Sequence, residues 1–338
     1  MLLDRLWNPM LDRRTALAAL GAGLLGRHWG AANAGQGGAD VNPSLLEGIS
    51  SKSRTRLLQI VNEPGFSGQI PPDDVKHLVE TEGTTIDAVQ VRLLPLARTY
   101  SRPPLSNFHV GAVVCGSSGS LYLGANIEFP GHSLGLAVHA EQAALSNAYM
   151  HDERGVAAIA VTATPCGHCR QFMNELEPQG EIHVLVGTNP AAKLSSLLPA
   201  AFGPKDLGLK HGAFPPTPVE LTLPQRASDD VTAAALAAAG KSYAPYTKAY
   251  SGIAISTKAG RIYKGSYIEN AAFNPSLSPF QVALVALILA GEDASAISTV
   301  VLVEVEGAVI SQKSVTDAAL SSVASAAKLR TVTAARRA

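Results

Sequence analysis

The chain repeats its own pattern of residues at a spacing of 141 positions. Shifting the sequence by that amount superposes five residues without a gap: Gly111 on Gly252, Gly119 on Gly260, Tyr122 on Tyr263, Gly124 on Gly265 and Glu128 on Glu269. A repeat of this length is long enough to be a whole domain. We therefore predict that the 338 residues contain two domains of the same fold.

Each copy of the repeat has the pattern strand, turn, strand, helix, strand, helix. The expected strands are 108–114, 120–126 and 157–162 in the first copy, and 252–255, 261–265 and 299–304 in the second. Strands that bury both faces between helices predict a three-layer α/β/α sandwich with a mixed sheet. The composition, 46% hydrophobic and 16% charged, is sufficient for two buried cores.

The repeat and the local composition also predict the domain boundaries. Residues 38–85 form a helical arm with helices at 52–62 and 72–80, and residues 86–210 form the first copy. The proline-rich stretch HGAFPPTPVELTLPQ, residues 211–225, is expected to be a linker to the second copy at 226–338.

Only the first copy carries a set of metal-binding side chains. His139-Ala-Glu141 is followed by Pro165-Cys166-Gly-His-Cys169. One imidazole and two thiolates are typical zinc ligands, and three protein ligands leave a position for water, as in catalytic sites. Pro165 is expected to begin a helix, which places both cysteines on one face of its first turn. Glu141, near another helix start, can then exchange protons with the water.

Other interpretations of these residues stay open from the sequence. The C-x-x-C pair could be redox-active, and His168 could be a fourth ligand that closes the site. His109, His132 and His151 have no partner at a ligand spacing and are expected to be surface or packed residues. Cys115 lies in the apolar run FHVGAVVC and is expected to be in the core.

The second copy is predicted to have lost the metal site. Continuing the 141-residue shift places His139 on Phe280 and Glu141 on Val282, and no cysteine follows Cys169. A duplicated fold that keeps its strand pattern without its chemistry is expected to act as a structural or interface partner.

The combination H-x-E and P-C-x-x-C is the signature of zinc nucleobase deaminases. More closely, the chain resembles the two-domain, dimeric bacterial type of cytidine deaminase. The stretches that carry the resemblance are LPLARTY from Leu94, PLSNFHVGA, GANIEFPG, VHAEQAAL, TPCGHCRQFMNEL, AFGPKDL and, in the second half, ENAAFNPSLSP. Together they cover most of residues 38–300.

The resemblance implies an activity and a cofactor. The reaction is hydrolytic deamination of cytidine and deoxycytidine to uridine and deoxyuridine plus ammonia, a step of pyrimidine salvage. One Zn²⁺ per subunit is held by His139, Cys166 and Cys169. Glu141 carries a proton from the water to N3 of the pyrimidine and to the leaving amine.

The resemblance also implies substrate-binding residues. They are Phe108, Asn126, Ile127, Glu128, Phe202 and Phe273. Asn126 and Glu128 bond the ribose hydroxyls, and Phe108 packs on the base. Phe202 and Phe273 reach the active site of the other subunit of a homodimer. Without the family, Asn126 reads as a turn residue and the phenylalanines as core aromatics.

Charge limits the class of substrate. With 27 basic and 27 acidic residues and a pI near 7.1, the chain has no excess positive charge for a polynucleotide. A small nucleoside is therefore the expected partner, with no nucleic acid. Two alternatives stay open: a deaminase of another free base or nucleoside, and a zinc-bound protein that binds pyrimidine nucleosides without catalysis. The intact Glu141 argues against the second.

Residues 1–37 lie outside the resemblance. Arg13-Arg14 precedes the apolar run TALAALGAGLLG and the A-x-A pattern that ends at Ala34. This order predicts a twin-arginine signal for export to the periplasm, cleaved after Ala34. A disordered extension, or a start codon placed too early, explains the stretch equally well, and the resemblance implies the cytoplasm. The run is too short to span a membrane.

Overall fold

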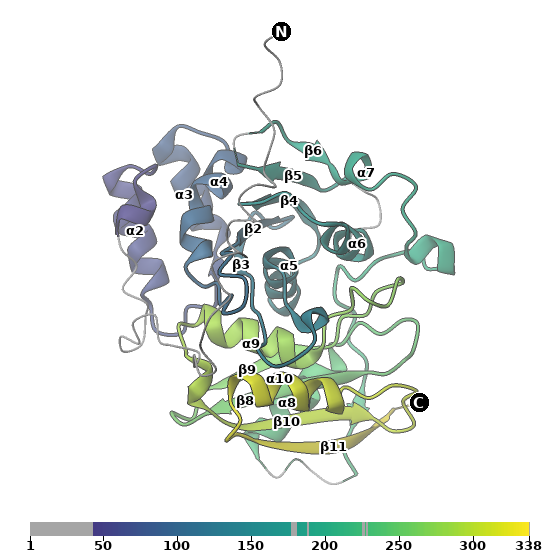
Figure 1. The fold of residues 1–338 in the computed structure, drawn as a ribbon. Coiled ribbons are helices and arrows are strands. Elements are labelled where there is room, and N and C mark those ends of the chain that lie inside the picture. The colour runs from purple at the N-terminus through teal and green to yellow at the C-terminus, as the bar shows by residue number, and fades with distance from the viewer. Residues whose placement is uncertain (1–42, 177–180, 188, 225–226, 228, 338) are drawn as a thin grey trace, which may run out of the picture. The chain divides into compact units, whose positions relative to one another are not determined.

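The computed structural model describes residues 43–176, 181–187, 189–224, 227 and 229–337 (Figure 1). The expected signal or extension at 1–37, with its cleavage site, lies outside these residues. None of the helices in the described part of the chain is long and apolar enough to cross a membrane.

A six-stranded mixed sheet forms the first half of the fold. In spatial order its strands are β1 Gln69–Ile70, β3 Leu121–Ala125, β2 Gly111–Gly116, β4 Val156–Val161, β5 His183–Val186 and β6 Ala192–Lys193. Only β4 and β5 pair in parallel, and the chain crosses between them through α6, Gly167–Leu176. The other neighbours are antiparallel.

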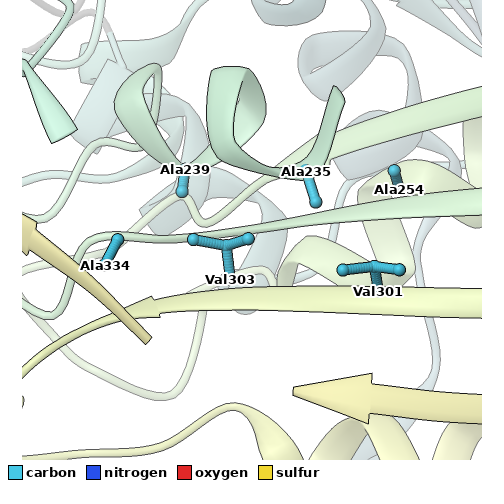
Figure 2. Packing of buried hydrophobic residues seen from close by; sticks show 6 residues of the cluster. All are labelled: Ala235, Ala239, Ala254, Val301, Val303 and Ala334. Carbon is cyan, nitrogen blue, oxygen red and sulfur yellow. The ribbon is translucent and has the colours of Figure 1, made fainter. Parts of the chain in front are cut away.

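A five-stranded mixed sheet forms the second half. In spatial order its strands are β7 Leu221–Thr222, β11 Lys328–Arg336, β10 Ile297–Val305, β8 Ser251–Thr257 and β9 Ile262–Ser266. Here β10 and β11 are the parallel pair, joined through α10, Lys313–Val323. Small residues of α8, Asp230–Gly240, pack on this sheet in the cluster shown in Figure 2: Ala235, Ala239, Ala254, Val301, Val303 and Ala334.

Four glycines show why helices cover both faces of each sheet. A Cβ on Gly124 would lie 2.1 Å from the Ala144 nitrogen in α5, Ala140–Met150, whereas a Cβ on Gly111 would lie 2.6 Å from the Arg98 nitrogen in α4, Ile86–Arg98. Because Gly124 pairs with Ala112, Gly111 points to the opposite face. Gly252 and Gly265 meet α8 and α9, Pro279–Leu289, in the same way. Both halves are therefore α/β/α sandwiches, which confirms the predicted fold class.

The register of the repeat needs one correction. Gly124 faces Ala144, but its counterpart Gly265 faces Ala283, which is a shift of 139 positions and not 141. The loop before the helix is two residues shorter in the second half. The residue before α5 is His139 and the residue before α9 is Ser278, so Ser278 is the counterpart of His139, and Phe280 that of Glu141. The predicted pairs with Phe280 and Val282 were wrong, although neither counterpart could bind metal.

Most predicted strands and helices are present within a few residues of their expected bounds. The elements outside the predicted pattern include α4, its counterpart α8, and the strands β5 and β11. Helix α4 carries Pro95 in its last turn, which obscures the helical spacing. Strand β11 contains exposed Lys and Arg side chains, so its sequence resembles a surface segment. Its assignment as a strand depends on the pairing with β10. Inside the expected linker 211–225, β7 pairs with β11.

The two halves are joined by a reciprocal pair of hydrogen bonds. The Gln142 Nε2 donates to the Pro275 carbonyl at 3.2 Å, and the Gln281 Nε2 donates to the Leu136 carbonyl at 2.7 Å. Gln142 and Gln281 are the third residues of α5 and α9, and these two helices pack on each other. Equivalent residues exchanging equivalent bonds is the pattern of an isologous interface. The duplicated halves thus associate as two subunits would.

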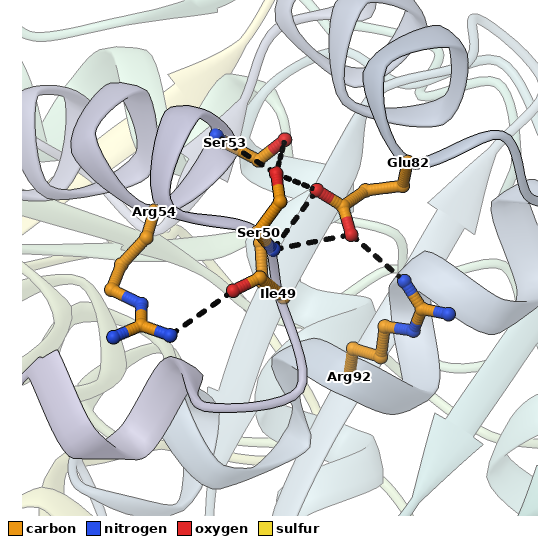
Figure 3. A network of polar contacts seen from close by, with 6 residues as sticks. All are labelled: Ile49, Ser50, Ser53, Arg54, Glu82 and Arg92. Atoms are coloured by element: carbon orange, nitrogen blue, oxygen red, sulfur yellow. Dashed lines mark hydrogen bonds and ion pairs between the residues drawn. The ribbon is translucent and has the colours of Figure 1, made fainter.

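The N-terminal arm contains α2 Ser51–Val61 and α3 Pro72–Glu82, close to the predicted 52–62 and 72–80. Figure 3 shows how Glu82 joins α2, α3 and α4: its carboxylate accepts from the Ser50 nitrogen at 3.1 Å and from Arg92 at 3.0 Å. Burial alone would raise the pKa of Glu82, but hydrogen bonds from Ser50 and Ser53 hold it below its usual range. A carboxylate beside the start of α2 also complements the helix dipole.

Shorter helical segments complete the fold. They are α7 Leu194–Leu197 and the 3₁₀ turns Pro43–Leu46, Leu134–Leu136, Pro204–Leu207 and Ala294–Ala296.

Gly124→Ala tests the close approach of helix and strand. The added methyl group would collide with the backbone of α5, so we expect the free energy of unfolding to fall by about 1–3 kcal/mol in chemical denaturation. Gly48→Ala is the control, because a Cβ at Gly48 comes no closer than 3.9 Å to a neighbour. Equal stability of the two variants would contradict the argument.

Candidate metal centre

Helix α5 begins at the candidate site because His139 caps it. His139 has extended backbone angles (φ −83°, ψ 154°), and its carbonyl accepts the first helical bond, from Ala143, at 2.9 Å. The His139 nitrogen donates to the Gln142 side chain at 3.2 Å. This capping arrangement fixes the backbone from which the imidazole projects.

Helix α6 begins at the same place, at Cys166. The helix spans Gly167–Leu176, and the Cys166 carbonyl accepts from the Arg170 nitrogen at 3.1 Å. Pro165 was predicted to be the first residue of this helix, but it precedes the cap. Cys166 sits at the cap and Cys169 in the first turn, where unpaired amides favour a thiolate. Both ligand-bearing helices thus point their N-termini at one position.

The three predicted ligand atoms have the spacing of a tetrahedral zinc site. His139 Nδ1 lies 3.5 Å from Cys166 Sγ and 3.3 Å from Cys169 Sγ, and the two sulfurs are 3.8 Å apart. Tetrahedral zinc bonds of about 2.3 Å to sulfur and about 2.0 Å to nitrogen place two sulfurs about 3.8 Å apart and sulfur and nitrogen about 3.5 Å apart. Within the described ranges, this trio is the group that could hold a metal ion.

The polar contacts within the trio prepare it for a cation. A hydrogen bond from Cys169, followed by one from His139, lowers the pKa of Cys166 to about 3. The same contact with Cys166, together with burial, raises the pKa of Cys169. The hydrogen bond to Cys166 also raises the pKa of His139, against the effect of burial. These contacts favour the thiolate form of Cys166, and a bound metal ion would favour it for Cys169 as well.

Glu141 lies beside the trio but outside it. It is the second residue of α5, it is 4% exposed, and it shares a hydrogen bond with Cys169. Burial raises the pKa of Glu141, and its own backbone amide and His139 oppose the rise. A buried carboxyl group with a raised pKa next to a metal position is suited to take up and release a proton.

The other candidates are not part of the trio. The His168 ring stacks on the His139 ring at 5.6 Å, and its Nε2 lies 3.2 Å from the Gln142 amide. The separation of the Cys166 and Cys169 sulfurs, 3.8 Å, is far beyond the bond length of a disulfide. Cys115 is buried in β2, as expected.

The three histidines without a partner at a ligand spacing are packed or surface residues, as expected. His109 contacts Ser101, His132 contacts Ser321 and His151 contacts Ser67.

The predicted ribose contacts lie at the end of β3 and hold a loop. Glu128 accepts from the Leu105 nitrogen at 2.8 Å and from the Ser106 nitrogen at 2.9 Å. The Asn126 side chain accepts from the Val110 nitrogen at 2.9 Å and donates to the Phe108 carbonyl at 2.8 Å. Both side chains therefore organise residues 105–110, and Asn126 is more than a turn residue.

Ile127 is placed differently from its two neighbours. Its side chain is buried, and its backbone nitrogen and carbonyl both pair with Val138 at 2.9 Å. This pairing joins the end of β3 to the residue before His139. Its contribution to the site is thus to align Asn126 and Glu128 with the start of α5.

The three predicted aromatic residues are exposed and are not core residues. Phe108 is 51%, Phe202 47% and Phe273 63% exposed. Phe273 also has φ +60°, a conformation that a side chain of this size rarely adopts without a local reason. Large exposed aromatic side chains are typical of binding surfaces.

Gln142 is a site residue that the sequence analysis missed. It bonds the backbone of His139, and its amide contacts His168. The signal was present, since a glutamine three residues after a helix cap is the capping-box pattern.

The comparisons with known proteins agree with this site. Residues 85–185 and 194–317 both match the family described as "Cytidine and deoxycytidylate deaminase zinc-binding region". The cytidine deaminase of Vibrio atlanticus is 41% identical over 278 residues, which is 82% of this chain and 94% of that protein. The cytidine deaminase of Pectobacterium atrosepticum is 43% identical over 276 residues, 79% of this chain and 90% of that protein.

The chain belongs to the cytidine deaminase family. It is an enzyme, a hydrolytic deaminase, and its cofactor is zinc. This confirms the resemblance found in the sequence. The second matched region has kept the fold, although no cysteine follows Cys169.

Among solved structures, the cytidine deaminase of Burkholderia pseudomallei aligns with 34% of this chain and 98% of its own, at 33% sequence identity and a TM-score of 0.30.

Cys166→Ala tests the ligand set. Loss of one of three ligands should remove most of the zinc, which elemental analysis of the purified protein would measure. Cys115→Ala is the matched control, because Cys115 is the one cysteine of the chain outside the trio and lies in β2. Full zinc occupancy in Cys166→Ala would contradict the assignment, and so would zinc loss in the control.

Proposed function

We propose that this chain deaminates cytidine and deoxycytidine to uridine and deoxyuridine, with His139, Cys166 and Cys169 holding zinc and Glu141 moving the protons. The observation that carries the proposal is the ligand trio at tetrahedral spacing with a buried carboxyl group beside it. Three ligands and an adjacent acid/base group are the features of a catalytic and not a structural zinc site.

Zinc, when bound, supplies a Lewis acid that lowers the pKa of water to about 7. Glu141 takes the proton of the water that adds to C4 of the pyrimidine, and passes it to N3. Glu141 then takes the proton of the new C4 hydroxyl group and delivers it to the amino group, so that the C4–N bond breaks, ammonia leaves and the oxygen stays on C4 as a carbonyl. The burial of Glu141 supports this exchange, because a carboxyl group with a raised pKa gives up its proton less readily to bulk solvent.

Asn126, Glu128 and Phe108 are proposed to bind the nucleoside. A carboxylate and an amide can each accept or donate further bonds beyond those to residues 105–110. We propose that the ribose hydroxyls form these further hydrogen bonds with Asn126 and Glu128. Phe108, held in that loop through its carbonyl and half exposed, can pack on the base. A site built to bond hydroxyl groups strongly rejects analogues that lack them.

The alternative functions have less support. A deaminase of another base would not need the two polar side chains at the end of β3, Asn126 and Glu128. A binding protein without catalysis would not need a buried Glu141, because a carboxyl group is costly to bury. The balanced charge of 27 basic and 27 acidic residues argues against a polynucleotide substrate.

We also propose a homodimer with an active site at the subunit interface. Phe202 and Phe273 project from loops and are 47% and 63% exposed, and a second copy of the chain would cover them. Each would then reach the site of the partner. The cytoplasm is the proposed compartment, because Cys166 and Cys169 must stay reduced until zinc binds.

Glu141→Gln should retain zinc and lose turnover. The amide has the shape of the carboxyl group but cannot relay protons, so we expect kcat for cytidine to fall by about 10² to 10⁴ in an ultraviolet assay. Glu153→Gln is the control, because Glu153 is also buried but bonds Tyr122 and two serines. Near-normal kcat in zinc-loaded Glu141→Gln would refute the proposed role.

Mixing two inactive chains tests the shared site. Glu141→Gln lacks the acid/base group, and Phe273→Ala lacks the proposed partner contact. Hybrid dimers would contain one intact site, so an equal mixture should recover about one quarter of wild-type activity, since half of the dimers are hybrid. The control mixture, Glu141→Gln with Cys166→Ala, should recover none if both residues serve the same subunit's site. No recovery in the first mixture after subunit exchange would disprove the shared site.

A further inference from the structure

A tight turn of the metal-free half, residues 270–276, lies against the metal centre of the first half. Five hydrogen bonds close the turn, one of them from the Asn274 nitrogen to the Ala272 carbonyl at 2.8 Å. The Phe273 nitrogen donates to the Asn270 carbonyl, and the Ser276 nitrogen to the Phe273 carbonyl, each at 2.9 Å. The Ser276 hydroxyl accepts from the Asn270 nitrogen, and the Asn270 side chain accepts from the Ala272 nitrogen, also at 2.9 Å. The turn is thus a stiff unit with few free polar groups.

The end of the turn binds the start of α5. The Pro275 carbonyl accepts from the Gln142 amide at 3.2 Å, and the oxygen of the same side chain accepts from the His139 nitrogen at 3.2 Å. Gln142 is almost completely buried. One glutamine side chain therefore joins the turn directly to the backbone of a zinc ligand.

The beginning of the turn binds α6. The Ala271 nitrogen donates to Glu175 Oε2 at 2.8 Å, and the Asn270 amide donates to the Gln171 carbonyl at 3.2 Å. The other Glu175 oxygen accepts from the hydroxyls of Tyr243 at 2.8 Å and Tyr246 at 2.7 Å, which also belong to the second half.

Burying Glu175 costs more free energy than a simple packing contact would. It is fully buried, and burial raises the pKa of its carboxyl group, against the effect of its three donors. A buried carboxylate is tolerated only where donors meet it in defined positions, whereas apolar side chains would stabilise the same contact without that demand. Such a group specifies geometry more than it adds stability. It lies six residues after Cys169, about 9 Å along the same helix.

We propose that Glu175 is a positioning residue for the zinc ligands: with Gln142 it binds the 270–276 turn as a brace between α5 and α6, and this brace sets the distance between His139 and the two cysteines. The metal-free half thereby contributes to a metal centre to which it gives no ligand. The inference rests on the proposed ligand set of His139, Cys166 and Cys169.

The test measures zinc release from the zinc-loaded full-length enzyme to an excess of chelator. Tyr246→Phe and Glu175→Gln remove or weaken the bonds at the brace, and we expect zinc to leave about tenfold faster, the usual lower limit for partners that orient a ligand. Tyr122→Phe is the matched control, since its hydroxyl also donates to a buried carboxylate, Glu153, at 3.0 Å but within the first half. Its zinc release should equal that of the wild type.

Thermal unfolding of the same samples separates positioning from stability. The brace is refuted if Tyr246→Phe releases zinc at the wild-type rate. It is also refuted if Tyr122→Phe releases zinc as fast as Tyr246→Phe and both rates follow the loss of Tm. Should Glu175→Gln fail to fold, Tyr246→Phe alone decides, because it removes one hydroxyl and keeps the carboxylate.

Phe273→Ala distinguishes this inference from the proposed function. Phe273 belongs to the turn, but its side chain is exposed, so its removal should leave zinc release unchanged. Loss of cytidine turnover in the zinc-loaded variant supports the substrate role, and wild-type turnover refutes that role without contradicting the brace. Retention of zinc by Cys166→Ala would instead refute the ligand set.

Discussion

The metal centre depends on the convergence of two helix N-termini. Helices α5 and α6 start from His139 and Cys166, so the unpaired amides of two first turns face the position where a cation and two thiolates meet. The arrangement requires α5 to lie directly on β3, which Gly124 permits, and α6 to cross from β4 to β5. The ligand spacing of 3.3–3.8 Å is the outcome of these two packings.

The second half has diverged in chemistry while its geometry has been kept. Tyr122 and Glu153 of the first half are matched by Tyr263 and Glu292, again joined by a hydroxyl–carboxylate bond. Glu269 holds the loop at 246–247 as Glu128 holds the loop at 105–106. At the metal position, however, Ser278 and Phe280 replace His139 and Glu141. Glu269 is buried, whereas Glu128 is half-buried, so the equivalent of the proposed substrate site has become part of the core.

This divergence gives the two halves different tasks at one interface. The reciprocal bonds of Gln142 and Gln281 preserve the symmetric contact of a duplicated fold. The bonds to Glu175 break that symmetry, because Tyr243 and Tyr246 serve a carboxylate on the helix that carries Cys169. The second half binds no metal, but its donors satisfy a buried carboxyl group of the first half. Loss of these donors would therefore leave that group without hydrogen bonds.

The sequence by itself determined the fold class, the duplication and the residues of the zinc trio, because strand alternation, glycine spacing and ligand chemistry are local properties that a short motif displays. It did not determine the start of α6 at Gly167 or the two-residue shift that aligns Ser278 with His139, because both depend on how a helix end packs. Only the tertiary structure decided the roles of Glu175, Tyr243 and Tyr246. Glu175 lies 68 residues before Tyr243 and 71 before Tyr246, and no periodicity in the chain relates a carboxyl group to donors that approach it from another domain.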